Sequence, residues 1–564
     1  MIQRFFNLLL IITVIVTTGC KKDFLERLPL DTPVDDSYWA NENNVRTFAW
    51  GFYPNYFEGY ATGFMLGWGG FSYGQSLNDD LAPSSPSPFT RVVPASGGGW
   101  SFFSVRKANL FITRVQTVPM DAEAIKHWTG VGRLFRALEY DELVKRFGDV
   151  PWYGREITNA EDPELYKPRD SRILVMDSVL ADFKYAAENV RVNDGNDGLT
   201  VNKNVVLALM SRVFLYHGTL FKYHNISQAK AVEYLQAAQW AANEVIKSNK
   251  FAITDNYRSI FNSLDLSGKK EIILYRRYET SIIMHSLHSY VNKEPQSGSS
   301  KNAIEAYLAK DGLPISISPL YKGDKTITNV MTDRDPRLTE TIARELRIRN
   351  VATNYTTSGY ASIKFFNESI KDLPEGNSQT NTTDAPEIRF GEVLLNYAEA
   401  TAELGLLTQA DLDKSINLLR ARPGIGIPKL QVLGNQPAVN GKVYVDPKRD
   451  PTVPSLIWEI RRERRTELIF EGFRLDDLKR WKKLDYTDTQ LNKDINRGAW
   501  IKRSDFPGTS VTIENNAAEG YIIPAPSAAT QRTFDPKYYL EPLPLDQIKL
   551  YLDKGVDLKQ NPGW

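Results

Sequence analysis

The chain has 564 residues, 42% hydrophobic and 24% charged, which is typical of a soluble globular protein with a sizeable core. Lys and Arg total 69 against 68 for Asp and Glu, so a net charge of +1 gives no overall attraction to nucleic acid or to anionic lipid. The single cysteine, Cys20, excludes an intrachain disulfide and a multi-cysteine metal site.

The N-terminus has the pattern of a lipoprotein signal. A short basic start at residues 1–4 precedes an apolar run at residues 5–16 and the small residues before Cys20. We therefore expect residues 1–19 to be a signal peptide and residues 20–40 to be a lipidated tether. The alternatives are a plain secretion signal with a chance cysteine and a membrane anchor, but a run of about 12 residues is too short to span a bilayer.

Helical periodicity follows along the chain. Apolar residues recur at helical spacing over 130–147, which should end at Gly148-Asp149, and again over 204–217 and 227–247. Ala237, Ala238, Ala241 and Ala242 mark a face that another helix can approach closely.

A helix pair over 392–404 and 409–420, joined by a turn at Gly405, has about the length of one tetratricopeptide unit. Residues 205–251 resemble a longer version of that unit. The sequence thus predicts a mainly α fold with tetratricopeptide-like helical repeats.

Long stretches without clear period separate the helical blocks. They cover 58–99, 275–336, 373–386, 423–454 and 500–564. Loops of this length in a compact chain are disordered or functional, and the first two contain too many aromatic residues for simple disorder. We expect these irregular loops to form a ligand face.

Catalytic and nucleic-acid-binding motifs lack their structural context. Residues 70–74 match the G-x-S-x-G pattern of serine hydrolases, but neither a buried strand before Ser72 nor a helix after it is predicted. The basic run 461–465 is interleaved with glutamates at helical spacing, so we expect an ion-paired, nearly neutral helix and no nucleic-acid binding.

Metal and cofactor motifs are also weak. His285 and His288 could share a helical face, but no carboxylate stands at the spacing of a zinc hydrolase, so a loop or surface pair is the better interpretation. We expect no metal and no cofactor.

The ordered set of segments along nearly the whole chain resembles the SusD/RagB family of surface lipoproteins. The segments that carry this resemblance are Cys20–Glu26, Arg133–Ala137, Phe147–Pro151, Arg389–Ala400, Ile416–Arg422, Glu463–Gly472, Asp477–Trp481 and Gln560–Trp564. One departure is Val131-Gly132, where the family usually has a Gly-Glu pair.

The resemblance implies a tetratricopeptide-containing α fold that binds oligosaccharide or polysaccharide without cleaving it. It also implies an outer-membrane protein held at the cell surface by its lipid and partnered with a SusC-like TonB-dependent transporter. On this basis residues 41–564 form one helical domain. Its N-terminal part covers about 41–260, an irregular insertion about 261–385, and the C-terminal part about 386–564.

Sugar rings stack on aromatic faces, while their hydroxyls need amide and charged partners. The family's sugar contacts lie in variable loops, so we select candidates from the two irregular regions richest in aromatic residues. These are Trp68, Tyr73, Asn78, Asp79, Arg91 and Trp100 in the first region, and Tyr290 and Asn292 in the second.

Two other classes of function stay open. One is a surface-tethered esterase or glycosidase, which a turnover assay would reveal. The other is a structural adaptor whose repeats bind only protein, which would fail a glycan-binding screen.

Overall fold

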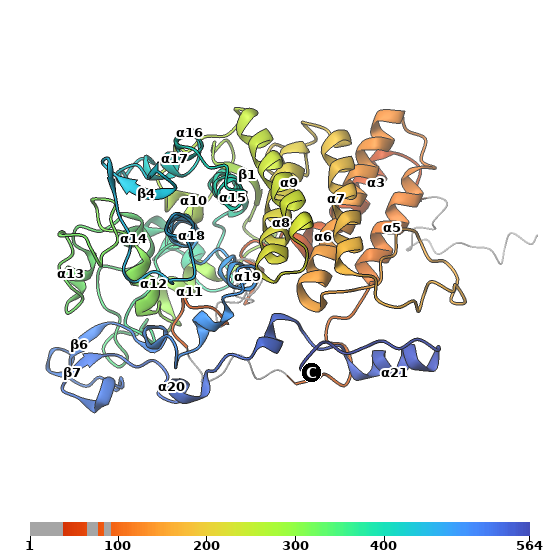
Figure 1. Cartoon of the computed structure of the whole chain (residues 1–564). Coiled ribbons are helices and arrows are strands. Elements are labelled where there is room, and N and C mark those ends of the chain that lie inside the picture. The colour runs from red at the N-terminus through yellow and green to blue at the C-terminus, as the bar shows by residue number, and fades with distance from the viewer. Residues whose placement is uncertain (1–37, 65–76, 84–91) are drawn as a thin grey trace, which may run out of the picture.

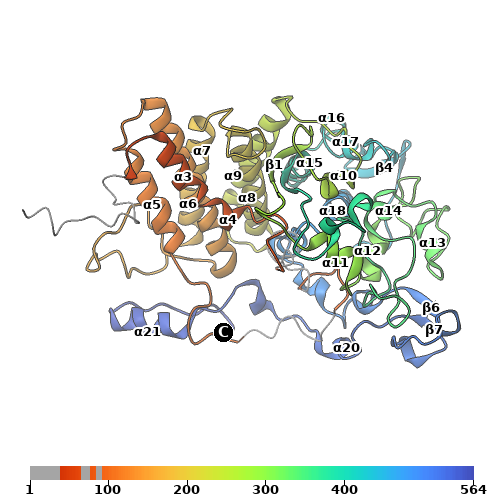
Figure 2. The same ribbon diagram turned by 180° about the vertical axis from the view of Figure 1, so that it is seen from behind.

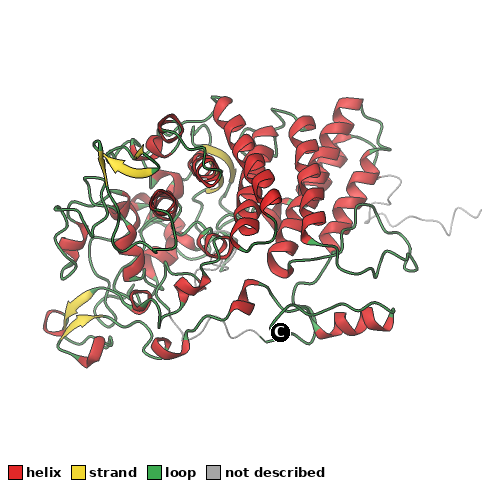
Figure 3. Cartoon of the chain, viewed as in Figure 1, coloured by secondary structure: helices red, strands yellow, loops and turns green. Residues whose placement is uncertain are grey.

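The computed structural model describes residues 38–64, 77–83 and 92–564 of a mainly helical protein (Figures 1 and 3). Long helices stand side by side at one end of the molecule, and shorter helices and irregular segments form the other end. The long helices and their neighbours are α3 (Glu42–Trp50), α4 (Tyr53–Tyr56), α5 (Phe103–Val115), α6 (Ala122–Phe147), α7 (Arg172–Asn189), α8 (Lys203–Tyr223) and α9 (Gln228–Lys247).

Polar N-cap residues fix where the long helices begin. Asp121, Ser171, Asn202 and Ser227 each accept a hydrogen bond through the side chain from a backbone N–H in the first turn of α6, α7, α8 and α9, respectively. These N–H groups have no partner within the helix, so each cap stabilises its helix start by about 1 kcal/mol.

The second half is built from short elements around α15 and α18 (Figure 2). Its helices are α10 (Ser259–Asn262), α11 (Leu287–Lys293), α12 (Lys301–Ala306), α13 (Ile327–Met331), α14 (Arg337–Thr341), α15 (Phe390–Glu403), α16 (Gln409–Asp413), α17 (Ile416–Arg420), α18 (Ser455–Glu467), α19 (Arg474–Arg480), α20 (Ala528–Gln531) and α21 (Leu545–Asp553). From α20 onward the chain runs back beneath the long helices to α21 (Figure 1).

The strands form three small antiparallel sheets. They are β1 (Ile272–Arg276) with β2 (Ala385–Arg389), β3 (Gln431–Leu433) with β4 (Gln436–Val439) and β5 (Lys442–Val443), and β6 (Trp500–Lys502) with β7 (Glu519–Tyr521).

Strand β1 lies at the boundary between two hydrophobic clusters. One cluster fills the space between the long helices and α15, and the other fills the irregular half. Ile273 and Leu274 belong to the first cluster, whereas Ile272 and Tyr275 belong to the second. The two cores therefore share one strand.

Helix α8 forms the centre of the helical half. Its length and composition would allow it to cross a membrane, but 94% of its most apolar window is buried inside the protein. It packs against α9, where an added Cβ at Gly218 would come within 2.7 Å of Leu235 Cγ and 3.0 Å of the Leu235 backbone nitrogen. Glycine at this position permits the close approach of the two helices.

Most predicted helices are present, with different bounds. The periodicity over 130–147 belongs to the longer α6, which ends as predicted at Gly148, a residue with φ +77°. Residues 227–247 form α9 with Ser227 as its cap, and Ala238, Ala241 and Ala242 are fully buried as expected.

The predicted second helix of the unit after Gly405 is not continuous. It divides into α16 and α17 because Ser415 leaves the helical conformation, with φ −135° and ψ −100°, and its hydroxyl donates to the carbonyl of Asp411. A serine side chain that bonds to its own backbone competes with the helix.

Gly218→Ala should destabilise the protein by about 1–3 kcal/mol, because the new methyl group meets the backbone of α9. The gain in helix propensity, about 1 kcal/mol, offsets only part of this loss. Denaturant unfolding would measure the change. Gln236→Ala, at an exposed position of α9, is the matched control and should change the unfolding free energy by less than about 0.5 kcal/mol. Equal stability of Gly218→Ala and the parent would contradict the close contact.

Candidate ligand-binding site

A cavity of about 430 Å³ opens between α12, α18 and α19 and the segments 446–450 and 485–494. Its volume is within the range of small-ligand sites. The side chains that line it include Trp458, Trp481, Tyr486, Asn302, Asp79, Glu305, Asp446, Asp450, Asp485, Asp494, Lys448, Arg449, Arg461, Arg462, Arg465 and Arg474.

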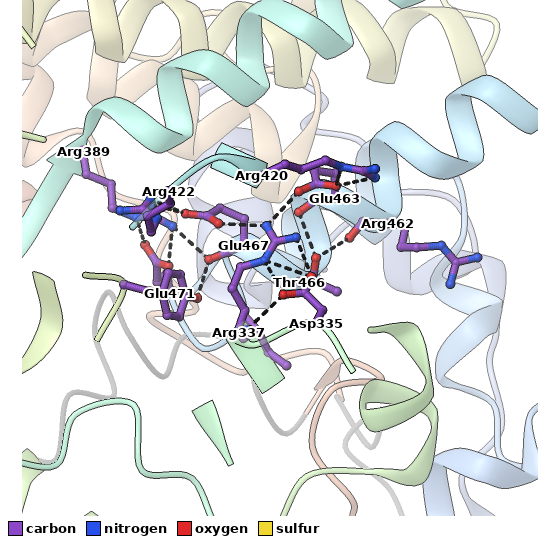
Figure 4. A network of polar contacts seen from close by, with 12 residues as sticks. Asp335, Arg337, Arg389, Arg420, Arg422, Arg462, Glu463, Thr466, Glu467 and Glu471 are labelled. Carbon is purple, nitrogen blue, oxygen red and sulfur yellow. Dashed lines mark hydrogen bonds and ion pairs between the residues drawn. The ribbon is translucent and has the colours of Figure 1, made fainter. Parts of the chain in front are cut away.

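A buried ion network behind the cavity fixes the position of α18 (Figure 4). Its centre is Glu467, whose carboxylate accepts hydrogen bonds from the guanidinium groups of Arg389, Arg422 and Arg337 at 2.8, 2.9 and 3.0 Å. The donors come from β2, from the turn after α17 and from α14, so the network joins three elements to α18.

The network extends one turn along α18. Glu463 accepts a hydrogen bond from Arg420 Nε at 2.9 Å and forms an ion pair with Arg337 at 2.8 Å, and Arg337 also pairs with Asp335 at 2.7 Å. All of these side chains are almost inaccessible to solvent. Buried charges are tolerated only when they are paired, so these contacts depend on one another.

Burial alone would raise the pKa of Glu467, but the three guanidinium groups outweigh it and hold the pKa at about 2. The carboxylate therefore stays ionised over the physiological pH range, and the attachment of α18 does not change there.

The other face of α18 lines the cavity. Trp458, Arg461, Arg462 and Arg465 follow one another at the i, i+3, i+4 and i+7 spacing that places side chains on one side of a helix. The ion network thus fixes the helix whose opposite side contributes the cavity wall.

Of the lining aromatic residues, Trp458 is the one that forms no hydrogen bond among the described residues, although the guanidinium of Arg462 lies 5.9 Å from its ring centroid. Its ring is half-buried, and its indole N–H has no hydrogen-bond partner among the described residues. Trp481, in contrast, donates to Glu399 at 2.7 Å and lies beneath the guanidinium of Arg461, 4.4 Å from the ring centroid. The Tyr486 hydroxyl donates to Asp450 at 2.5 Å.

Most charges in the cavity compensate one another. Asp79 binds Arg474 through two hydrogen bonds of 2.7 and 2.8 Å, and Asp446 pairs with Arg462. Such a wall presents polar atoms to a ligand without a strong net field. A half-buried indole among compensated charges suits a ligand with apolar C–H faces and many hydroxyl groups.

The family model for the SusD family matches residues 285–564. The chain belongs to the SusD family. Solved SusD-like structures share its fold over almost the whole length, so the predicted mainly α, tetratricopeptide-like architecture is confirmed. No curated protein matches the chain.

Two of these structures are from Bacteroides fragilis. One is a SusD-like protein with 22% identity and a TM-score of 0.66, covering 95% of this chain and 100% of its own. The other is a SusD-like carbohydrate-binding protein with 20% identity and a TM-score of 0.66, covering 91% and 99%. A surface glycan-binding protein A from Bacteroides fluxus has 17% identity and a TM-score of 0.58, covering 93% and 100%.

In this SusD-family structure, the sequence-predicted site residues that are described do not gather in one place. Trp68, Tyr73 and Arg91 lie outside the described residues, as do the hydrolase-like motif 70–74 and Cys20. Of the described candidates, Asp79 lines the cavity, where it is bound to two arginines. Its neighbour Asn78 is buried, and its side-chain oxygen accepts from the Asp80 N–H.

The other three described candidates lie outside the cavity lining. Trp100 is 6% exposed and packs edge-on against Phe102 and Phe147 in the helical core, which leaves little ring surface for a ligand. Tyr290 and Asn292 are partly buried within α11, and the Asn292 amide donates to the carbonyl of Lys371 at 3.3 Å.

The surface interpretation of His285 and His288 is wrong. Both rings are fully buried, and each bonds through Nε2 to a backbone carbonyl, of Thr383 and Asn367 respectively, at 3.0 Å. Burial lowers the pKa of His285 to about 3, so it stays neutral. The described residues contain no cluster of three His, Cys, Asp or Glu that could hold a metal ion.

Sequence reasoning missed Trp458 and Asn302 as possible ligand contacts. Trp458 lies within the helix that was interpreted as ion-paired and nearly neutral. An indole among so many charges is itself a signal, because a tryptophan in an exposed helix has no core to fill.

Glu467→Gln should destabilise the protein by about 3–5 kcal/mol, because it removes the carboxylate that three buried guanidinium groups share. These groups then keep only their other partners, Asp335, Glu463, Glu271 and Glu471. Chemical denaturation at neutral pH would measure the loss. Glu345→Gln is the control, since Glu345 is 68% exposed and pairs with Arg347 at 3.5 Å.

The contribution of Glu467 to stability should also depend on pH. The folded-state pKa of Glu467 lies below its ordinary value of 4.5, so its stabilisation is complete above pH 4.5 and is lost as the pH falls toward 2. The stability difference between the parent and Glu467→Gln should therefore shrink over that interval. A difference that is unchanged down to pH 2 would contradict the depressed pKa.

Proposed function

We propose that this SusD-family protein is a non-catalytic receptor that binds oligosaccharides or polysaccharides at the cell surface. The observation that carries the proposal is Trp458, a half-buried indole whose N–H has no partner, in a cavity wall of compensated charges. Solved proteins of the same fold are described as carbohydrate-binding, glycan-binding and laminarin-binding, which supports the ligand class.

The cavity has the chemistry that a sugar requires. A pyranose can place its C–H face on the indole, and its hydroxyls both donate and accept hydrogen bonds. In the same cavity lining, Asn302 Oδ1 and Arg461 Nε are buried atoms with no partner among the described residues. The first is an acceptor and the second a donor, which matches the two roles of a hydroxyl group.

Delivery to a transporter is the second part of the proposal. A receptor held by a lipid on Cys20 would capture glycan and pass it to a SusC-like TonB-dependent barrel in the outer membrane. Capture followed by release requires modest affinity, in the micromolar to millimolar range. The candidates Trp68, Tyr73, Arg91, Tyr290 and Asn292 remain proposed further contacts in the flanking loops.

Trp458→Ala should weaken glycan binding roughly threefold to tenfold, because a ring contributes about 0.5–1.5 kcal/mol beyond burial. The mature chain with Cys20→Ser is first screened against a panel of polysaccharides for binding and for turnover. Titration calorimetry then compares the variants. Trp240→Ala is the matched control, because Trp240 is 46% exposed on α9 and outside the cavity.

A folded Trp458→Ala variant that binds the glycan as tightly as the parent would contradict the assignment of this cavity as the glycan site. Trp68→Ala and Tyr290→Ala would then be tested in the same titration. Glycan hydrolysis that disappears in Ser72→Ala would instead support the esterase alternative, and a screen without any glycan ligand would support the protein-binding adaptor.

Cys20→Ser should release the protein from the membrane fraction, because the lipid attached to Cys20 is the proposed anchor. Fractionation of cells that lack the partner transporter would test the lipid anchor, because no transporter barrel could then hold the protein in the membrane fraction. A Cys20→Ser protein that stays membrane-bound in such cells would contradict the lipoprotein assignment.

A further inference from the structure

The arginines of the cavity show a regular pattern of pairing. In Arg474, Nε and Nη2 donate side by side to the two oxygens of Asp79. Arg465 uses the same two nitrogens on Asp80 and Asp79, and Arg462 uses them on Glu459 and Asp446. This edge of a guanidinium, with two parallel N–H groups, matches a carboxylate.

Arg461 leaves its Nε unpaired but still pairs with Glu403 through Nη2. Arg449 departs further from the pattern. Its Nη1 donates to the backbone carbonyls of Asp450 and Val453 at 3.1 and 2.8 Å, which holds the guanidinium in place. Its Nε has no hydrogen-bond partner, and no carboxylate among the described residues forms an ion pair with it. The nearest carboxylate in sequence, Asp450, is already bound to Lys483, Tyr486 and Thr452.

The internal segments that the structure does not describe offer no carboxylate partner for this guanidinium. The two internal segments outside the described residues, 65–76 and 84–91, contain neither Asp nor Glu. A half-buried guanidinium, positioned by two carbonyls in the cavity lining, thus has no carboxylate partner among the described residues, and its Nε is itself buried.

Resting on the proposed glycan function, we propose that the cavity selects an acidic glycan, whose uronate carboxylate binds the guanidinium of Arg449 while a sugar face lies on Trp458. A charge-assisted hydrogen bond of this kind supplies both charge and direction. The proposal names the class of sugar that the site takes.

The remaining charges in the cavity fit this arrangement. Asp485 is the lining carboxylate that has no cation within ion-pair distance among the described residues. It would accept hydrogen bonds from the hydroxyls of a uronate, whereas the carboxylate of the ligand would be directed to Arg449. Lys448, 64% exposed and 3.4 Å from Glu305, adds positive charge at the rim.

The test uses pairs of polysaccharides that differ only in charge. Polygalacturonate, alginate and hyaluronan are each compared with their carboxyl-reduced form, by titration of the mature chain carrying Cys20→Ser. The parent should bind the acidic member of at least one pair about tenfold more tightly than the reduced member, and added NaCl should weaken only the acidic binding.

Arg449→Gln should lower the affinity for that acidic glycan to the level of its reduced form, while the reduced form binds within twofold of the parent value. Arg449→Lys keeps the positive charge but loses the planar guanidinium. It should therefore retain only part of the preference for the acidic over the reduced glycan. Arg277→Gln is the control, because the Arg277 side chain is 63% exposed and lies outside the cavity. Thermal unfolding checks that each variant is folded.

The outcomes separate this inference from the function on which it rests. A parent that binds neutral glycans and prefers no acidic partner overturns the acidic specificity and leaves the receptor function standing. The acidic specificity is also overturned if Arg449→Gln loses affinity for both members of a pair equally, or for neither of them. A chain that binds no glycan at all overturns both.

Discussion

The buried carboxylate of Glu467 is the constraint on which the second half of the molecule depends. Three guanidinium groups converge on it from β2, α14 and the turn after α17, and none of the four side chains can be removed without leaving charge in the core. Hydrophobic packing tolerates substitution by groups of similar volume, but a multi-residue ion cluster tolerates far less. The helices of this half contain too few residues to be stable alone, so they depend on the ion cluster to hold them in place.

The same constraint gives the cavity its shape. Helix α18 presents glutamates to the network on one side and Trp458 with three arginines to the cavity on the other. The ion network fixes α18 on the side away from the cavity. The side chains that face the cavity therefore have defined positions before a ligand binds. A binding site that is organised before the ligand arrives loses less entropy on binding.

The sequence predicted some of these features, and the reasons for success and failure are physical. The start of α9 at Ser227 and the end of α6 at Gly148 were predictable because caps are local. The break between α16 and α17 depends on one hydroxyl that bonds to its own backbone, and periodicity does not detect it.

The glutamates of α18 were interpreted as partners for arginines within the same helix. That holds for Glu459 with Arg462, but Glu463 and Glu467 bind arginines from other elements. Helical spacing identifies which charges lie on one face of a helix. It does not identify what that face meets in the folded protein, and for this reason the cavity and Trp458 emerged only from the structure.

The shared strand β1 has a consequence for how the protein unfolds. Ile272 and Tyr275 pack into one core, Ile273 and Leu274 pack into the other, and the paired strand β2 ends at Arg389 of the ion network. Neither core can unfold without separating β1 from the other core and exposing buried charge. We therefore expect the chain of 564 residues, although long enough for several independent domains, to unfold as one cooperative unit, with local opening mainly at its periphery.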